Sequence, residues 1–142
     1  MSFQPSDFLE ISKEISDLTN DNKPINNITK KGAWLRTIVG RSYYSAFITL
    51  RERLEKSSYP ILIRHNAEDH GEIIKALNKD LPRPLRVFSN DLKTLHSNRT
   101  NADYDLNPTP SIDDGLATTA IKQAEGIIKN AKTIVNSMTV ET

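Results

Sequence analysis

The segment from Ile28 to Lys56 constrains the fold of this chain more than any other, because it is predicted to form one long helix. Its apolar residues recur at spacings of three and four, the pattern of an amphipathic helix. They are Leu35, Ile38, Val39, Tyr43, Ala46, Phe47, Leu50 and Leu54. A face this broad requires several neighbours, so we expect a central helix. Gly40 lies inside it and is expected to permit close approach of another backbone.

The rest of the chain shows the same helical spacing, and no alternating run of strand length appears. Further helices are predicted over about Pro5–Leu18, from Asn66 to about Lys79, from the Pro82–Pro84 region to Arg99, and from Ser111 to Met138. The segments between them contain Pro, Asn and Asp, which are typical of connections. Residues 1–142 are therefore predicted to form a single all-α domain, an antiparallel bundle of four to five helices.

Composition limits the classes of function. The 142 residues include 19 basic and 18 acidic residues and no cysteine, so neither a polybasic surface nor a disulfide framework is expected. No apolar run approaches the ~18 residues of a membrane span. The N-terminus has no basic region followed by an apolar region, so no signal peptide is expected. These features predict a cytoplasmic protein that does not contact membranes.

An arginine interrupts the apolar stripe of the helix that ends near Arg99. The stripe consists of Leu85, Phe88, Leu92, Leu95, Arg99 and Ala102. Burying an unpaired guanidinium costs on the order of several kcal/mol, so Arg99 requires a carboxylate, a phosphate or a hydrated cleft. One interpretation is a structural ion pair with Asp103, one turn on. The other is a functional arginine in a groove or at a subunit interface.

Polar residues that can hold a phosphate are expected around Arg99. Arg41 and Tyr44 share one edge of the central helix and are expected to reach the helix that carries Arg99. Asp103, Tyr104 and Asp105 follow Arg99 closely. Arginines can hold a phosphate while hydroxyl groups orient it, but the same set can form a buried ion-pair network.

The sequence predicts neither a metal site nor a cofactor. The three histidines, His65, His70 and His96, lie far apart in the sequence and do not have a spacing typical of zinc. The glycines are scattered, so a phosphate-binding loop is not expected. The serines show no nucleophile-elbow pattern.

Three motifs in one order resemble the HEPN family. They are Arg41-Ser-Tyr-Tyr-Ser-Ala-Phe47, His70-Gly71 and Leu95-x-x-x-Arg99-x-x-Ala-Asp-Tyr-Asp105, within about Trp34–Asp105. The likeness is greatest to the small prokaryotic branch with RxYYxAF and RxxADY motifs. It implies an all-α bundle of four or five helices that pairs into homodimers. Members include endoribonucleases of toxin–antitoxin, phage-defence or RNA-processing systems, partners of minimal nucleotidyltransferases, and inactive binding modules.

The resemblance also implies roles for individual residues. Arg99 matches the family arginine that stabilises phosphate charge, whereas the histidine that usually follows has no counterpart here. Ile48 also stands where relatives often carry a histidine. His96 precedes Arg99 by three residues and is the better substitute for the base. Asp103 is the weaker one, because a carboxylate beside an arginine has a lowered pKa.

Three hypotheses of function follow. The first is an RNA-directed protein that cleaves without metal through the ribose 2′-hydroxyl, with Tyr104 positioning the phosphate or donating a proton. Arg41, Tyr44 and Asp105 would contact the substrate. The second is a non-catalytic dimeric module that binds nucleotide, nucleic acid, or a partner such as a nucleotidyltransferase or an antitoxin. The third is a structural bundle whose polar cluster only fixes packing.

Overall fold

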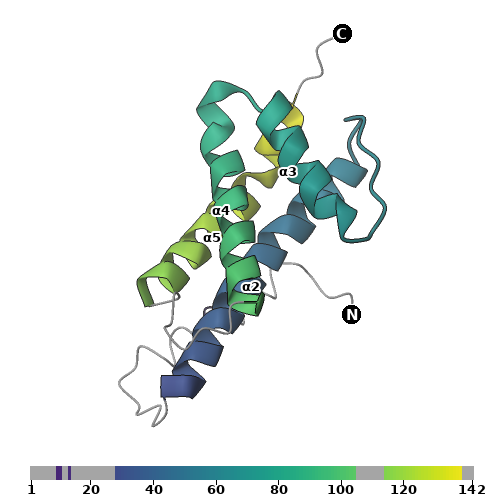
Figure 1. Cartoon of the computed structure of the whole chain (residues 1–142). Coiled ribbons are helices and arrows are strands. Elements are labelled where there is room, and N and C mark those ends of the chain that lie inside the picture. The colour runs from purple at the N-terminus through teal and green to yellow at the C-terminus, as the bar shows by residue number, and fades with distance from the viewer. Residues whose placement is uncertain (1–8, 11–12, 14–27, 105–113, 139–142) are drawn as a thin grey trace.

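The fold consists of four α-helices and one short 3-10 helix in the part of the chain that the structure describes (Figure 1). The structure is a computed structural model and describes residues 9–10, 13, 28–104 and 114–138; for 28–33, 102–104 and 114 it describes the backbone alone. The elements are α2 (Ile28–Glu55), α3 (Glu68–Asp80), η1 (Arg83–Leu85), α4 (Arg86–Tyr104) and α5 (Asp114–Ser137). These residues contain no strand, which confirms the prediction of the all-α class.

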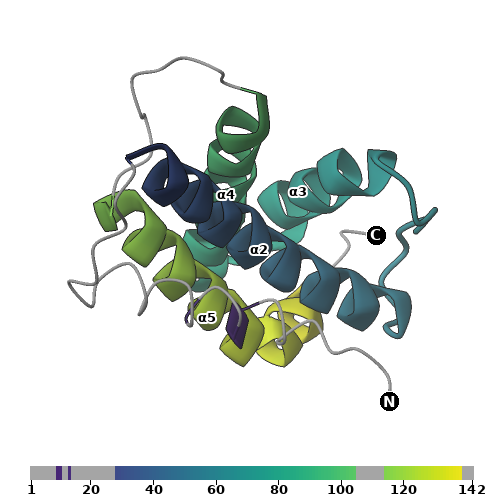
Figure 2. The ribbon, with the colours of Figure 1, turned by 90° about the horizontal axis from the view of Figure 1, so that it is seen from below.

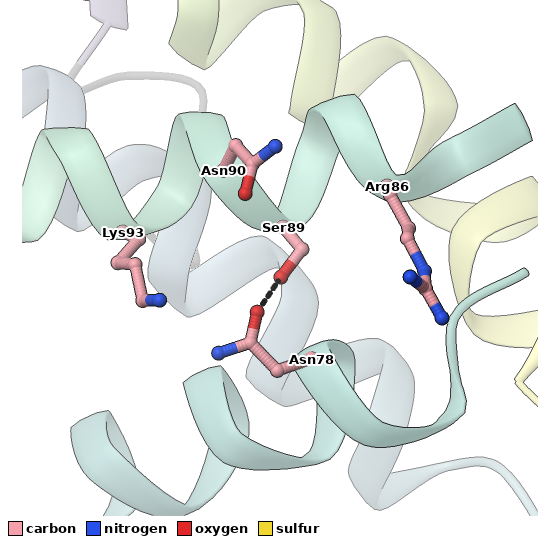
Figure 3. A pocket seen from close by; sticks show the side chains of 5 residues that line it. All are labelled: Asn78, Arg86, Ser89, Asn90 and Lys93. Carbon is pink, nitrogen blue, oxygen red and sulfur yellow. Dashed lines mark hydrogen bonds between the residues drawn. The ribbon is translucent and has the colours of Figure 1, made fainter. Parts of the chain in front are cut away.

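The helices pack in an order that places α2 and α4 at the centre. α2 contacts α5 and α4, and α4 also contacts α5 and α3. Figures 1 and 2 show that α4 runs opposite to α2, α3 and α5, whereas α2 and α5 run in the same direction. Ser89 of α4 donates a hydrogen bond of 2.6 Å to the Asn78 side chain of α3, which fixes the stagger of this pair (Figure 3).

The core forms around α2, as its apolar pattern predicts. All eight apolar residues that the sequence assigned to its inner face are buried. α4 contributes Leu92 and Leu95 to this core. The buried face of α5 contains several small side chains, which permit close packing; its members are Ala117, Ala120, Ile121, Ala124, Ile127, Ala131, Ile134 and Val135. α2 thus packs against both α4 and α5 along its buried face, and the core forms around it.

The segment between α2 and α3 is a loop, as predicted. Ile61 and Ile63 pack against the core, while the Leu62 side chain is 65% exposed. The next helix starts at Glu68, and Asn66 caps it as expected: the Asn66 side chain accepts the Glu68 N–H at 2.9 Å. α4 extends beyond the predicted end at Arg99, to Tyr104.

Two predictions concern segments that are mostly outside the described residues. Of the helix predicted over Pro5–Leu18, residues 9, 10 and 13 are described and are helical, with Leu9 buried in the core. The capping pattern at Ser111 lies outside the described residues, and α5 begins at Asp114. No helix within the described ranges is both long and apolar enough to cross a membrane.

Gly40 does not mark a close approach between the helices that the structure describes, so that expectation is wrong for these helices. A Cβ atom placed on Gly40 meets no atom of the described residues within 4 Å outside its own helical backbone. The Gly40→Ala variant is therefore expected to raise the free energy of unfolding by about 1 kcal/mol, the difference in helix propensity. Urea unfolding measures this change, and an unchanged or lowered value would show that the position is sterically constrained.

Candidate functional site

Polar and aromatic side chains gather where α2, α3 and α4 meet. We call this group the His70–His96 cluster. Its members are Tyr43, Tyr44 and Phe47 of α2, His70 of α3, and His96 and Arg99 of α4. The ring centroids of His70 and His96 lie 5.8 Å apart, although 25 residues separate them in the chain. The cluster thus joins side chains from three helices.

His70 is held on two sides by α2. Its ring stacks on Phe47 with centroids 4.0 Å apart and planes 14° apart, and its Nδ1 atom contacts the Tyr43 hydroxyl. Tyr43 is fully buried, and burial raises the pKa of its hydroxyl, which therefore stays protonated. The hydroxyl therefore forms a hydrogen bond with His70 Nδ1 as a neutral group, and the tautomer of the imidazole sets which of the two atoms donates.

Both histidines of the cluster are neutral near pH 7. Burial, followed by the charges of His96 and Arg99, lowers the pKa of His70 to about 4. Burial and the charge of Arg99 also lower the pKa of His96. His96 packs edge-on against Tyr43 at a centroid distance of 5.3 Å, and its side chain is only partly buried. A neutral, partly exposed imidazole beside a cation has the protonation state that a general base requires.

Arg99 contacts Tyr44, as the shared edge of α2 predicts. Its Nη2 atom donates a hydrogen bond of 2.6 Å to the Tyr44 hydroxyl, and its guanidinium carbon lies 4.9 Å from the centroid of that ring. Both side chains are partly buried. The contact joins α2 to α4 and places a permanent positive charge beside His96, one helical turn away.

Several predicted site residues cannot be placed in the cluster. Arg41 is partly buried on α2, one turn before Tyr44. The side chains of Asp103 and Tyr104 and the whole of Asp105 lie outside the described residues, and so does the predicted Arg99–Asp103 ion pair. The interpretation of Arg99 as part of a structural ion pair therefore stays a prediction.

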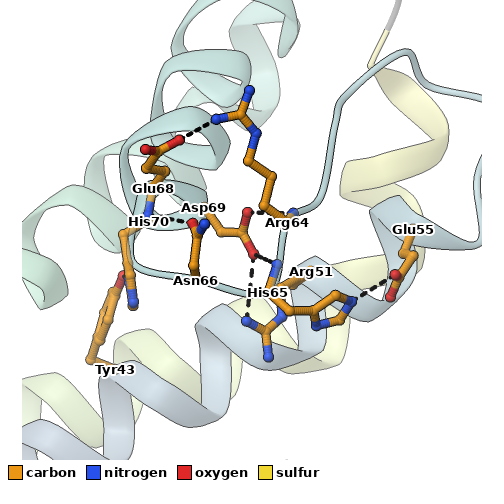
Figure 4. A network of polar contacts seen from close by, with 9 residues as sticks. All are labelled: Tyr43, Arg51, Glu55, Arg64, His65, Asn66, Glu68, Asp69 and His70. Atoms are coloured by element: carbon orange, nitrogen blue, oxygen red, sulfur yellow. Dashed lines mark hydrogen bonds and ion pairs between the residues drawn. The ribbon is translucent and has the colours of Figure 1, made fainter.

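A buried carboxylate fixes the start of α3 and with it His70 (Figure 4). The Asp69 side chain accepts the backbone N–H groups of Arg64 at 2.9 Å and His65 at 2.8 Å, and one of its oxygens lies 3.6 Å from Arg51 Nη1. Burial alone would raise the pKa of Asp69, but these hydrogen bonds and the arginine outweigh it and hold the pKa below its ordinary value. The loop is thereby anchored next to the cluster.

His65 stands apart from the cluster. Its side chain is exposed and its Nε2 atom lies 2.7 Å from Glu55. Its φ angle of 56° is in the left-handed region, which a residue other than glycine rarely adopts. The hydrogen bond from its N–H to Asp69 stabilises this conformation. His65 is therefore a suitable control for substitutions at the other two histidines.

The depressed pKa values predict a loss of stability in acid. Since the pKa of His70 is about 4 in the folded protein and 6.5 ordinarily, the unfolded chain binds more protons between these values. The free energy of unfolding is expected to be constant above about pH 6.5 and to fall as the pH drops toward 4, with His96 adding to the effect. Below the ordinary Asp69 value of 3.8 a second decrease follows.

Urea unfolding at a series of pH values measures this dependence. The His70→Asn variant is expected to be less stable at pH 7.5 but to lose less stability between pH 6.5 and 4. The matched His65→Asn variant should retain the full acid decrease. A protein that becomes more stable as the pH falls below 6.5 would contradict the burial of neutral histidines.

Sequence reasoning selected His96, Arg99 and Tyr44 but missed His70 and underrated Tyr43. Tyr43 was assigned to the core, which is correct for its ring, yet its hydroxyl also forms a hydrogen bond with His70. The signal for His70 was its place in the His70-Gly71 motif. Helical spacing alone does not connect α3 to α4, so that motif was the only route to it.

Comparison with known proteins does not identify a family for this chain. Comparison of the chain with protein-family models, with curated proteins and with solved structures finds no match to any of them. The fold and the cluster define an all-α helical protein in which two histidines and an arginine from neighbouring helices lie close together.

Proposed function

We propose that this chain is a HEPN-like, RNA-directed protein that cleaves RNA without a metal ion at the His70–His96 cluster. The observation that carries the proposal is the combination of two neutral imidazoles, 5.8 Å apart, with the guanidinium of Arg99. The family resemblance of the motifs around Arg41, His70 and Arg99 supports it. A cellular role in toxin–antitoxin or phage-defence systems follows from the same resemblance.

His96 is the proposed general base. It takes the proton from the ribose 2′-hydroxyl, whose oxygen then attacks the adjacent phosphorus. A new O2′–P bond forms and the P–O5′ bond breaks, which leaves a 2′,3′-cyclic phosphate and a 5′-hydroxyl. Protonated His96 returns its proton to the departing oxygen, directly or through water. Its lowered pKa keeps it in the neutral form that the first step requires.

Arg99 supplies the positive charge for the transition state. The pentacoordinate phosphorus carries extra negative charge on its oxygens, which a preorganised guanidinium stabilises. Tyr44 holds the guanidinium in place through the hydrogen bond of 2.6 Å. His70 is the proposed positioning residue, because Tyr43 and Phe47 fix its ring, and Nε2 is the ring nitrogen that Tyr43 does not contact. Asp103, Tyr104, Arg41 and Asp105 remain candidates for further substrate contacts.

The experiment is incubation of the purified protein with mixed RNA in excess chelator, followed by analysis of the ends. We expect cleavage with 2′,3′-cyclic phosphate ends. The His96→Asn variant should lose about 10²–10⁴-fold of the rate, as expected when a general base is removed. The His65→Asn variant should cleave as the parent does. Cleavage that the chelator abolishes, or products with 3′-hydroxyl ends, would overturn the proposal.

The second candidate is a non-catalytic homodimeric module that binds nucleotide, nucleic acid or a cognate protein such as a minimal nucleotidyltransferase or an antitoxin. The observation that favours it is the position of His70, whose Nδ1 atom and ring face are both occupied by α2. The sequence also has no histidine after Arg99. Absence of cleavage under all conditions, together with a dimer in sedimentation at tens of micromolar (an order-of-magnitude working range), would favour this module over the enzyme.

A further inference from the structure

A polar pocket lies between α3 and α4, beyond the His70–His96 cluster. It is an open pocket of about 280 Å³, and its lining consists of Asn78 of α3 and Arg86, Ser89, Asn90 and Lys93 of α4. Figure 3 shows Arg86 and Lys93 on either side of the Ser89–Asn78 hydrogen bond, both extending toward α3. The pocket therefore presents two cations, and none of its five lining residues is acidic.

The hydrogen bond inside the pocket directs a donor outward. Ser89 is buried, and its hydroxyl donates to the Asn78 carbonyl oxygen at 2.6 Å. The Nδ2 group of Asn78 consequently points away from Ser89 and is available as a hydrogen-bond donor. Two cationic side chains and an amide donor around one small space match the acceptor oxygens of a phosphate group.

Nearby carboxylates are engaged elsewhere. Asp91, the acidic residue next to Asn90 on α4, accepts a hydrogen bond of 3.3 Å from Gln123 of α5. Asp80, at the end of α3, accepts one from the Tyr59 hydroxyl. Neither Arg86 nor Lys93 forms an ion pair with a residue that the structure describes. No carboxylate among the described residues therefore neutralises the positive charge of the pocket.

The pocket and the cluster lie along the same pair of helices. At one place Asn78 meets Ser89, and at the other His70 meets His96. His96 follows Ser89 by seven positions on α4, which corresponds to about 10 Å along the helix axis. One stacked nucleic-acid strand advances about 3.4 Å per nucleotide, so this separation spans about three nucleotides.

We infer that this pocket binds a phosphate of a single RNA strand whose cleavage site lies at the His70–His96 cluster, about three nucleotides away. The inference rests on the proposed function for the identity of the strand, and on the pocket itself for the phosphate. It assigns Arg86 and Lys93 to substrate binding and makes an oligonucleotide, rather than a mononucleotide, the preferred ligand class.

The test uses a fluorescent ten-residue 2′-O-methyl oligoribonucleotide, which lacks the 2′-hydroxyl nucleophile and reports binding alone. The Arg86→Gln/Lys93→Gln variant is expected to raise the Kd by on the order of tenfold. The slope of log K against log salt should fall by about 0.7 for each phosphate that the variant no longer neutralises. The matched control is Lys122→Gln/Lys129→Gln on α5, which removes two exposed cations at the same seven-residue spacing. It should leave the Kd unchanged.

Side-chain amide signals in NMR locate the ligand. Those of Asn78 and Asn90 should shift on addition of the oligonucleotide, whereas that of Asn130, bonded to the Gly126 carbonyl on α5, should not. Equal weakening by both double variants, no weakening by either, or shifts produced as strongly by adenosine monophosphate would overturn the inference. Failure of the proposed cleavage is measured separately. In that case unmodified RNA stays intact in chelator, while the protein still binds the 2′-O-methyl strand.

Discussion

The Arg99→Ala variant is expected to lose about 10²–10³-fold of the RNA cleavage rate while its unfolding midpoint changes little. The loss is the usual effect of removing one preorganised donor that stabilises transition-state charge. Stability should change little because the side chain is only partly buried and its contact with Tyr44 joins two helix surfaces rather than filling the core.

Two further variants make this prediction selective. Arg99→Lys retains the charge but lacks the planar fork of donors, so it should recover only part of the activity. Arg53→Ala removes an exposed arginine of α2 and should cleave normally. If Arg99→Ala unfolds as readily as a core truncation does, the structural interpretation of Arg99 prevails over the functional one.

The Phe47→Ala variant is expected to show the opposite profile, with the free energy of unfolding lowered by about 3–5 kcal/mol. Phe47 is 1% exposed on the inner face of α2. Its ring stacks on both Tyr43 and His70, and the Arg51 guanidinium lies 5.2 Å from its centroid. Truncation therefore creates a cavity and also removes the support beneath His70.

Chemical denaturation measures the loss, and Leu62→Ala is the control because that side chain is 65% exposed in the loop. Leu62→Ala should change the free energy of unfolding by no more than about 0.5 kcal/mol. A Phe47→Ala protein as stable as the Leu62→Ala protein would mean that the contacts around Phe47 contribute little to the core.

The His70–His96 cluster and the hydrophobic core share residues, so a substitution in the cluster can change both activity and stability. Tyr43 is a core residue by its ring and a site residue by its hydroxyl. Tyr43→Phe keeps the ring and removes the hydroxyl that contacts His70, so it separates the two roles better than alanine does. Activity measurements at the cluster need such isosteric variants, because truncations also change stability.

The sequence by itself determined the helices and their inner faces. The apolar residues of α2 recur with the helical period, and burying them excludes any other orientation of that helix. The same reasoning predicted the contact between Tyr44 and Arg99. It was wrong at Gly40, because a glycine in a helix lowers propensity whether or not another backbone approaches.

Only the tertiary structure decided which faces meet and how they are staggered. The period of a helix specifies what points inward, but the stagger of α3 against α4 depends on contacts such as Ser89–Asn78 and on the loop that Asp69 anchors. That stagger brings His70 within 5.8 Å of His96. The lowered pKa values follow from the resulting burial and from Arg99, and these are properties of the packed helices that residue spacing does not contain.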